Sequence, residues 1–297
     1  MSNKAKGNAA LLMTAMLWGT GFIAQKLGNE VLPPLAFNGI RAVMAAMVLC
    51  PFMAIRLRHT GYLSRSSNTI SQLEAKRGNL IRACAVCGFF LLVGTATQQI
   101  GLLTVSAGKS GFISSIYIVI TPLFSIMLGN KVRAKSILCA VIALAGFGVM
   151  SLKGGLGGAT AGDWFTLISA AGFAAQINAV NYFVDKDNDI MISVLQMAFC
   201  GTAGLVISLA TESFTLSQVA ACIPILLYST FIPTAGGYTL QVIGQKYTDA
   251  STAALLMSLE AVFAAIFGAL FLSEMMSVRE LAGSAIILAA VIWGQKE

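Results

Sequence analysis

Long apolar runs recur along the whole chain, and no other feature restricts its fold as strongly. A transmembrane helix needs about 20 mainly apolar residues, because the hydrocarbon core of a bilayer is about 30 Å thick. Runs of that length, separated by short polar breaks, fill the sequence. Only 10% of the residues are charged, whereas a soluble domain has about 25%. The pattern predicts an all-α integral membrane protein without a separate soluble domain.

The apolar runs predict ten transmembrane helices. The first run is too long for the core of a signal peptide and has no small-residue cleavage site before Gln25, so we expect it to stay on the chain. The predicted helices span residues 9–26, 34–55, 80–103, 108–129, 134–152, 163–183, 190–210, 218–244, 249–272 and 279–295.

The positions of Lys and Arg predict the orientation of these helices. With the N-terminus inside, fourteen of the 19 Lys and Arg residues lie in inner segments, four lie in outer segments, and Arg41 lies within a helix. The positive-inside rule then places both termini in the cytoplasm. The net charge of +7 therefore reflects topology. A nucleic-acid partner is not expected, because the sequence has no clustered basic face on a soluble surface.

The second half of the chain repeats the pattern of the first half at low identity. An offset of 143 residues places the segment 98–124 over 241–267, and Tyr117 then falls opposite Glu260. An offset of 155 residues places the first two predicted helices over the sixth and seventh, with Trp18 opposite Phe173. Both offsets divide the chain into halves of five helices each.

An odd number of helices in each half requires the halves to enter the membrane in opposite orientations. Charge agrees with this, because the predicted inner loop with Lys131 and Lys135 corresponds to a predicted outer loop with Glu274 and Glu280. Inverted repeats recur in secondary transporters, where they surround a central site. The predicted domains are repeats at 1–153 and 163–297, joined by a flexible Gly-rich linker at 154–162.

Glu260 is an ionisable residue near the middle of a predicted membrane span. A charge at that depth costs about 2.5 to 3.5 kcal/mol on insertion scales, so such a residue is a candidate for function. Three roles are compatible with its position: a carrier of coupling protons, a counter-ion for a substrate amine, or a structural group bonded to neighbouring helices. Its repeat mate Tyr117 is expected to approach the same depth.

Four segments carry a more specific resemblance. They are LLMTAMLWGTGFIAQKLG, PPLAFNGIRAVMAAMVL, AGKSGFISSIYIVITPLFSIML and ASTAALLMSLEAVFAAIFGALFLSE. In this order they resemble the motifs of the bacterial EamA-type branch of the drug/metabolite transporter superfamily. The resemblance implies an exporter of amino acids or similar small metabolites in the bacterial inner membrane, working by alternating access. It also implies a cavity lined by helices 1, 3, 4, 6, 8 and 9, with helices 2, 5, 7 and 10 at the periphery.

One departure from the family pattern concerns the ninth helix, where the family often has proline after the glutamate. Here Ala261 follows Glu260. A kink beside the site is therefore expected to be absent or softened, although Pro122 remains in the fourth helix.

Polar and aromatic residues on the helices expected to face the cavity are the candidate binding residues. Each could contact a substrate, and each could equally tie two helices together. Arg41, on a helix expected to be peripheral, is interpreted as structural, and Lys109 as reaching the membrane interface. The candidate substrate-binding residues are Glu260, Tyr117, Trp18, Gln176, Asn178, Gln98 and Gln241.

Other classes of function fit the sequence less well. The segment GKSG at 108–111 resembles the serine motif of intramembrane proteases, but the only histidine, His59, is expected in a cytoplasmic loop, far from Ser110. Cys84 and Cys87 do not complete a metal site. We therefore expect no enzyme, cofactor or metal; the alternative to a transporter is a membrane scaffold or receptor. Expected partners are a small-molecule substrate, lipid and coupling protons, and a monomer or weak homodimer is the expected unit.

Overall fold

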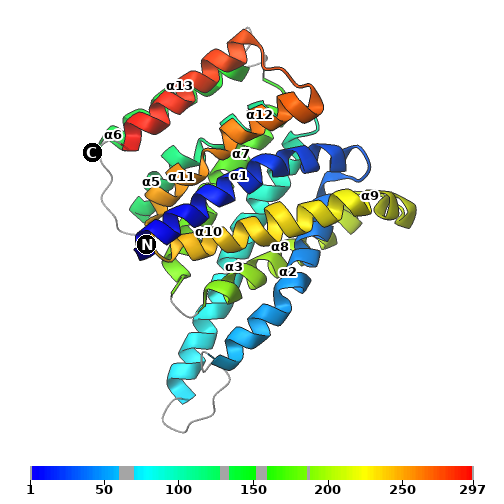
Figure 1. The fold of residues 1–297 in the computed structure, drawn as a ribbon, viewed down its shortest axis with the longest axis vertical. Coiled ribbons are helices and arrows are strands. Elements are labelled where there is room, and N and C mark those ends of the chain that lie inside the picture. Colours follow the sequence, from blue (N-terminus) through cyan, green and yellow to red (C-terminus); the bar gives the residue numbers. More distant parts are fainter. Residues whose placement is uncertain (1, 60–69, 128–133, 152–158, 186–187, 296–297) are drawn as a thin grey trace.

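The computed structural model describes residues 2–59, 70–127, 134–151, 159–185 and 188–295, and these residues form helices and no strands. The all-α fold is therefore confirmed for the described part of the chain (Figure 1). The helices are α1 (Asn3–Asn29), α2 (Pro34–His59), α3 (Ile70–Gly101), α4 (Ala107–Ser114), α5 (Tyr117–Met127), α6 (Ala134–Ser151), α7 (Ala161–Phe183), α8 (Asp189–Thr211), α9 (Leu216–Ser229), the π-helix η2 (Thr230–Gly237), α10 (Tyr238–Gln245), α11 (Ala250–Met257), α12 (Glu260–Leu272) and α13 (Val278–Gln295).

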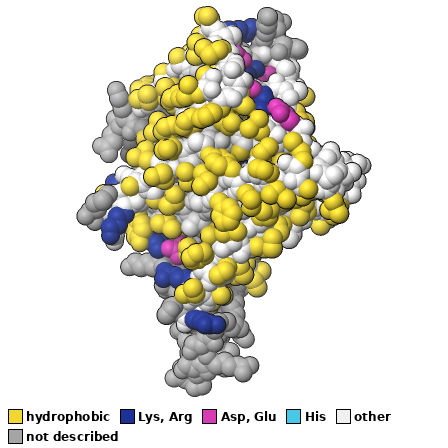
Figure 2. Space-filling model, turned by 45° about the vertical axis from the view of Figure 1, so that its right-hand side comes forward, with side chains coloured by type: hydrophobic (Ala, Val, Ile, Leu, Met, Phe, Trp, Pro, Cys, Tyr) yellow, Lys and Arg dark blue, Asp and Glu magenta, His cyan; other side chains and the backbone are white. Residues whose placement is uncertain are grey.

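Several helical segments can cross a membrane by length and composition. Figure 2 shows hydrophobic side chains over the middle of one face and charged ones near its two ends. The 23-residue helix α7 is not among these segments, since Gln176, Asn178 and Asn181 lower its mean hydropathy. The count of ten spans thus stays a prediction. Within the described ranges, the seven segments are Asn3–Asn29, Pro34–Arg58, Gly78–Gly101, Ala107–Phe124, Asp189–Thr211, Leu216–Gln245 and Ala250–Leu272.

Helices from the two halves of the chain pack against each other in pairs. α3 runs along α7, α2 along α8, and α1 along α12. α6 and α13 form a further pair at one edge of the bundle (Figure 1). Each pair takes one helix from each half, so the main core lies between the halves rather than within either of them.

The crossing of α3 and α7 depends on two glycines. A Cβ atom on Gly172 would lie 2.6 Å from the backbone nitrogen of Gly94, which is too close for any side chain. A Cβ atom on Gly94 would in turn lie 2.7 Å from the Phe173 ring. Small residues let membrane helices approach closely where a hydrophobic driving force between them is lacking. The close approach holds Phe173 between the two repeats.

Two helices that were expected to be continuous, the fourth and the ninth, are each broken near the middle. α4 ends at Ser114 and α5 begins at Tyr117; α11 ends at Met257 and α12 begins at Glu260. The offset of 143 residues relates the two breaks position by position. Tyr117 and Glu260 are therefore the first residues of two half-helices at equivalent places.

Matching hydrogen bonds stabilise the two breaks. The Ser115 hydroxyl donates to the Phe112 carbonyl at 2.8 Å, and the Ser258 hydroxyl donates to the Leu255 carbonyl at 2.7 Å. Ser115 and Ser258 are again related by the 143-residue offset. The repeat is thus visible in the backbone and its immediate partners, although few side chains are identical.

The kink beside Glu260 was expected to be absent or softened, because Ala261 replaces a proline. This expectation was wrong, since the helix breaks there without proline. The Ala261 nitrogen donates to the Ser258 carbonyl at 3.1 Å, and the Ile118 nitrogen donates to the Ser115 carbonyl at 3.1 Å. Both are i→i+3 bonds, which tighten the backbone where an α-helical ladder ends. Pro122 lies inside α5, beyond the break.

The predicted eighth helix is also irregular, since it consists of α9, η2 and α10. Pro233 lies inside the π-helix η2. Proline has no N–H to continue an α-helical ladder, and a wide turn accommodates the missing bond. The Pro233 carbonyl instead accepts a hydrogen bond from Trp18 Nε1 at 3.1 Å. This bond ties η2 to α1.

Candidate functional site

A small cavity lies where the helices of the two halves meet. Its volume is about 30 Å³, room for one or two water molecules. The side chains around it come from α1, α2, α3, α5, α7, η2, α10 and α12. They are Trp18, Gly21, Phe22, Gln25, Arg41, Gln98, Tyr117, Phe173, Gln176, Ile177, Pro233, Thr234, Tyr238 and Glu260.

The lining contains pairs of positions that the internal repeat relates. Three pairs on α1 and α7 follow the offset of 155, and the pair on α5 and α12 follows the offset of 143. The cavity therefore lies between the two halves, at positions that the internal repeat relates to each other. The pairs are Trp18 with Phe173, Gly21 with Gln176, Phe22 with Ile177, and Tyr117 with Glu260.

Tyr117 and Glu260 are buried at the two helix breaks, with exposed fractions of 1% and 4%. The Tyr117 hydroxyl lies beside the Glu260 carboxyl group and interacts with it, although the two groups do not form a hydrogen bond of normal geometry. Glu260 is the first residue of α12, where the helix dipole favours a negative group. The site thus contains a carboxyl group and a hydroxyl group that face each other across the two helix breaks.

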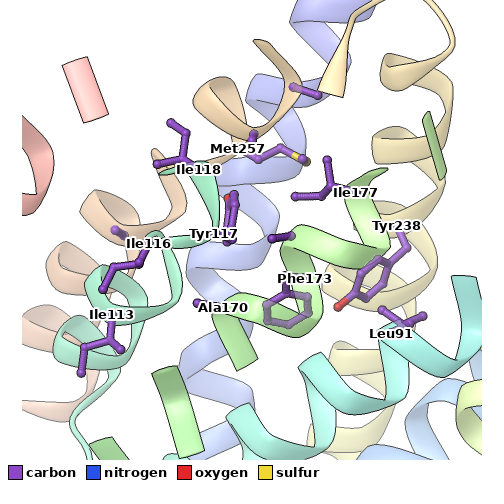
Figure 3. Close-up of a cluster of buried hydrophobic side chains, with 14 of the residues drawn as sticks. Leu91, Ile113, Ile116, Tyr117, Ile118, Ala170, Phe173, Ile177, Tyr238 and Met257 are labelled. Atoms are coloured by element: carbon purple, nitrogen blue, oxygen red, sulfur yellow. The ribbon is translucent and has the colours of Figure 1, made fainter. Parts of the chain in front are cut away.

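Aromatic rings enclose the cavity. The Trp18 and Tyr238 rings lie 4.9 Å apart, and Tyr117 meets Phe173 edge to face at 6.4 Å between ring centres. Figure 3 shows that Tyr117, Phe173 and Tyr238 come from three different helices and that the Tyr238 hydroxyl is directed toward the space beside Phe173. Tyrosine and tryptophan side chains combine an apolar ring surface with a polar O–H or N–H group.

The glutamines form short chains of hydrogen bonds between helices. Gln176 donates to Gln196 at 2.9 Å and accepts from Gln241 at 2.9 Å. Gln98 donates to the Ser114 hydroxyl at 3.0 Å. Gln98 and Gln176 reach the cavity, whereas Gln241 lies behind Gln176 and orients it.

Asn178 lies outside the cavity lining. Its side-chain nitrogen donates to the Thr121 carbonyl at 3.0 Å and to the Ala174 carbonyl at 2.9 Å. The first bond joins α7 to α5, and the second lies within α7. The structure therefore brings together five of the seven candidate residues around the cavity. The other two lie outside the lining, where Gln241 contacts Gln176 and Asn178 contacts the backbone of α5.

Arg41 is the cavity residue that the sequence interpretation placed wrongly. It was expected on a peripheral helix, yet its exposed fraction is 5% and its side chain reaches the cavity. The Arg41 guanidinium group contacts Gln25 of α1 and Ser229 of α9, so this face of α2 is turned toward other helices of the bundle. Asn38, one turn before Arg41, is also buried; two polar residues three positions apart share a helix face. That spacing was the available signal.

Ion pairs join the halves at one end of the bundle, which the topology prediction makes the outer end. Lys26 Nζ lies 2.7 Å from Glu274 Oε1. Lys109 was expected to reach the membrane interface, but its Nζ lies 2.7 Å from the buried Asp163 carboxylate at the start of α7. Lys109 thus joins the two halves, and its position at the membrane interface stays a prediction.

A second ionic cluster lies at the opposite end. Asp189, the first residue of α8, pairs with Lys246 after α10 and lies 3.8 Å from Arg56 of α2. Charged groups from both halves therefore hold each end of the bundle, with the cavity between the two clusters.

Two features of the alternative interpretations fall partly outside the described residues. His59 ends α2, and its side chain is not described; most of the linker at 154–162 is likewise outside the described ranges. Ser110 is fully buried in α4, and its hydroxyl has no hydrogen-bond partner among the described residues.

Comparisons with known proteins agree with the resemblance of the sequence motifs. An uncharacterized transporter of Archaeoglobus fulgidus is 29% identical over 95% of this chain and 83% of its own length. A WAT1-related chloroplastic protein of Arabidopsis thaliana is 26% identical over 95% of this chain and 67% of its own. The uncharacterized transporter YcbK of Bacillus subtilis is 24% identical over 70% of each chain. A solved crystal structure shares the fold, with a TM-score of 0.68 at 14% identity over 98% of both chains.

The family comparison covers both halves separately. The EamA-like transporter family matches residues 5–152 and again residues 160–293, which is nearly the whole chain. Two matches in one chain correspond to a two-repeat architecture, and the apolar helices correspond to a multi-pass membrane protein. This protein therefore belongs to the EamA-like transporter family, within the drug/metabolite transporter superfamily.

Proposed function

We propose that this protein is a secondary active transporter that exports amino acids or similar small metabolites across the bacterial inner membrane. The observation that carries the proposal is the cavity between the two halves, which is lined by pairs of positions that the repeat relates. Binding sites of inverted-repeat transporters lie at the repeat interface, beside broken helices. The description of the relatives from Archaeoglobus fulgidus and Bacillus subtilis as transporters supports the same class.

The proposed membrane arrangement has ten spans with both termini in the cytoplasm. α4 with α5, α9 with η2 and α10, and α11 with α12 each form one span, and the other seven helices form one span each. The repeats comprise residues 1–153 and 163–297, with the linker at 154–162 outside. Both repeats lie in one chain, so a monomer should be sufficient for transport.

The size of the cavity supports a mechanism of alternating access. A volume of about 30 Å³ cannot hold a metabolite, so the helices must separate before a substrate enters. Ionic clusters at both ends favour a closed arrangement. In the proposed cycle, one cluster opens while the other stays closed, and the site is exposed to one side of the membrane at a time.

Glu260 has the central role in this proposal, as the carrier of a coupling proton or as the partner of a substrate amine. The aromatic and amide side chains position the rest of the substrate, and the residues behind them hold the lining in place. The proposed contact residues are Glu260, Tyr117, Trp18, Gln98 and Gln176, supported by Gln241 and Asn178.

Transport by purified protein in liposomes tests the proposal. Liposomes loaded with unlabelled compound are assayed for uptake of the labelled form, over a panel of amino acids, amines, nucleosides and cationic drugs. We expect exchange of at least one amino acid or related metabolite, and none in protein-free liposomes. Binding without movement of any compound would favour a receptor instead, and neither binding nor movement would favour a scaffold.

A further inference from the structure

Arg41 is a buried cation in the cavity, and the transport proposal above gives it no role. Its exposed fraction is 5%, and it lines the same cavity as Glu260. An arginine keeps its proton in proteins. The cavity therefore contains a permanent positive charge in surroundings with little water.

The contacts of Arg41 are all with neutral groups. Its Nη2 donates to Asn38 Oδ1 at 2.9 Å and to Gln25 Oε1 at 3.3 Å, and its Nη1 donates to Ser229 Oγ at 3.4 Å. The guanidinium carbon lies 5.6 Å from the centre of the Phe37 ring. These partners orient the guanidinium group between α1, α2 and α9 but do not neutralise it.

No carboxylate of the described residues forms an ion pair with Arg41; the pairs found there involve Lys26, Arg56, Lys109 and Lys246. A buried charge without a counter-ion is strongly unfavourable. Since the chain supplies no such partner in the described residues, an anion that enters the cavity would compensate the charge.

Glu260 lies at a different level of the cavity from Arg41. α12 contacts α1 where Phe263 meets Gly19, so Glu260 lies about 4.5 Å from that level toward the start of α1. Gln25, which contacts Arg41, lies about 9 Å from the level of Gly19 toward the end of α1. The Glu260 carboxyl group and the Arg41 guanidinium group thus face the cavity from opposite ends.

The Arg41 group also has capacity for a further ligand. Its bonds to Gln25 and Ser229 are at the long end of the range for hydrogen bonds. A carboxylate binds guanidinium through two parallel charged bonds, which are shorter and stronger than these neutral ones. Carboxylate binding would therefore replace weak contacts with strong ones and leave the Asn38 bonds in place.

We propose that Arg41 binds the carboxylate of the transported molecule, so that the substrate carries a carboxylate and, in the zwitterionic case, directs its amine toward Glu260. This assignment rests on the proposed transport function. It names the class of substrate as amino acids or related carboxylates, and it disfavours amines, nucleosides and cationic drugs that lack an acid group. The aromatic rings of Trp18 and Tyr238 then accommodate the apolar part of the substrate.

Matched probes that differ only in their acid group test this assignment. Equilibrium binding to the full chain in nanodiscs is measured for phenylalanine and phenethylamine, and for leucine and isoamylamine. We expect at least one amino acid to bind ten or more times as tightly as its amine. Equal binding of both amino acids and their amines would overturn the assignment, and this part of the test needs no variant.

Variants of Arg41 then test whether this residue is responsible for the preference for an amino acid over its amine. In Arg41→Gln the preference for the amino acid over its amine should fall to less than threefold, and Arg41→Lys should retain part of it, because the charge remains but the paired geometry is lost. Arg56→Gln, at the end of the bundle, is the matched control and should keep the wild-type ratio. An unchanged ratio in Arg41→Gln, or an equal weakening for both probes, would show that Arg41 has only a structural role.

The two proposals fail in different ways. If no compound of the wide liposome panel binds or moves, the transport function itself is contradicted. If amines move as readily as amino acids, the protein remains a transporter and only the role of Arg41 is contradicted.

Discussion

Lys26 and Glu274 form an ion pair of 2.7 Å that joins three segments at one end of the bundle. The second oxygen of Glu274 accepts a hydrogen bond from the backbone nitrogen of Ala107 at 2.7 Å, at the start of α4. Lys26 also donates to the Val105 carbonyl at 2.8 Å. The end of α1, the start of α4 and the chain after α12 are thereby held together.

The opposite end of the bundle has a neutral counterpart of this contact. The repeat offsets relate Lys26 to Asn181 and Val105 to Thr248, and the Asn181 side chain donates to the Thr248 carbonyl at 3.1 Å. Equivalent positions thus close both ends, with a charged contact at one and an uncharged contact at the other. A substitution at Glu274 should therefore weaken the closure of the end near Lys26 more than the closure of the end near Asn181.

Glu274→Gln should loosen the end of the cavity near Lys26. The pair is partly exposed, with side-chain exposures of 24% and 20%, so it contributes about 0.2 to 1 kcal/mol. A cysteine at Thr234, which lines the cavity, reports access. We expect an impermeant maleimide, added from that side, to react up to about five times faster in Glu274→Gln.

Glu280→Gln is the control for this experiment. Glu280 lies in the same region, and its carboxylate accepts hydrogen bonds from the backbone nitrogen and the hydroxyl of Ser277, within one turn of the chain. Its substitution should leave the reaction rate unchanged. Equal rates in Glu274→Gln and in the parent protein would contradict a closing role for the ion pair.

Glu260→Gln should abolish net accumulation of the substrate while the protein still folds and inserts. The amide keeps the shape and hydrogen bonding of the side chain but cannot ionise. If Glu260 carries the coupling proton, exchange should persist and proton-driven accumulation should be lost. If it binds a substrate amine, binding should weaken by about 1.5 to 3 kcal/mol. Glu30→Gln, at an exposed position after α1, is the control.

Flux assays at several pH values, together with size-exclusion profiles, distinguish these outcomes for Glu260. Wild-type transport by Glu260→Gln at every pH would show that the residue only stabilises helix packing. The binding site would then have to be assigned to other residues of the cavity.

Tyr117→Phe should leave stability unchanged or raise it slightly, although the residue is one of the largest fully buried ones. The Tyr117 hydroxyl lies beside the Glu260 carboxyl group without a hydrogen bond of normal geometry, and an unsatisfied buried polar group costs about 1 to 3 kcal/mol. If the hydroxyl contacts a substrate, binding should weaken in the same variant. Thermal unfolding and equilibrium binding measure the two effects, and a marked loss of stability would point to a structural role instead.

Single cysteines test the proposed topology. Lys4 and Ser213 are exposed and lie at the start of α1 and between α8 and α9. With the N-terminus inside, Lys4→Cys should react with an impermeant maleimide only from the cytoplasmic side, and Ser213→Cys only from the outer side. The protein without either substitution gives the background from the native cysteines. Reaction of both positions from the same side would contradict the count of spans between them.

The sequence was sufficient to predict the pairing of Tyr117 with Glu260, because an acidic residue stands out in an apolar run and the repeat offset identifies its mate. The same reasoning failed for Arg41. A single arginine on a helix assigned to the periphery was interpreted as structural, while its side chain lies between α2, α1 and α9 and reaches the cavity. Which face of an apolar helix is buried depends on its neighbours, and a uniformly apolar helix gives little indication of that face.

The helix breaks were missed for a different reason. The residues at the fourth-helix break, Ser115 and Ile116, and at the ninth-helix break, Ser258 and Leu259, include neither glycine nor proline. Local propensity therefore predicts continuous helices. The breaks arise from the way the half-helices fit among α1, α7 and each other, which is a property of the assembled bundle.

The serine hydroxyls at these breaks have a consequence for motion inside a lipid bilayer. A backbone carbonyl left bare in hydrocarbon costs several kcal/mol, and this penalty would ordinarily keep a membrane helix straight. Ser115 and Ser258 each carry a donor on the same turn as the carbonyl they satisfy. Each serine hydroxyl thus supplies the hydrogen bond that a water molecule would supply at a bend outside the membrane. Each half-helix can therefore change its tilt without exposing that carbonyl to lipid.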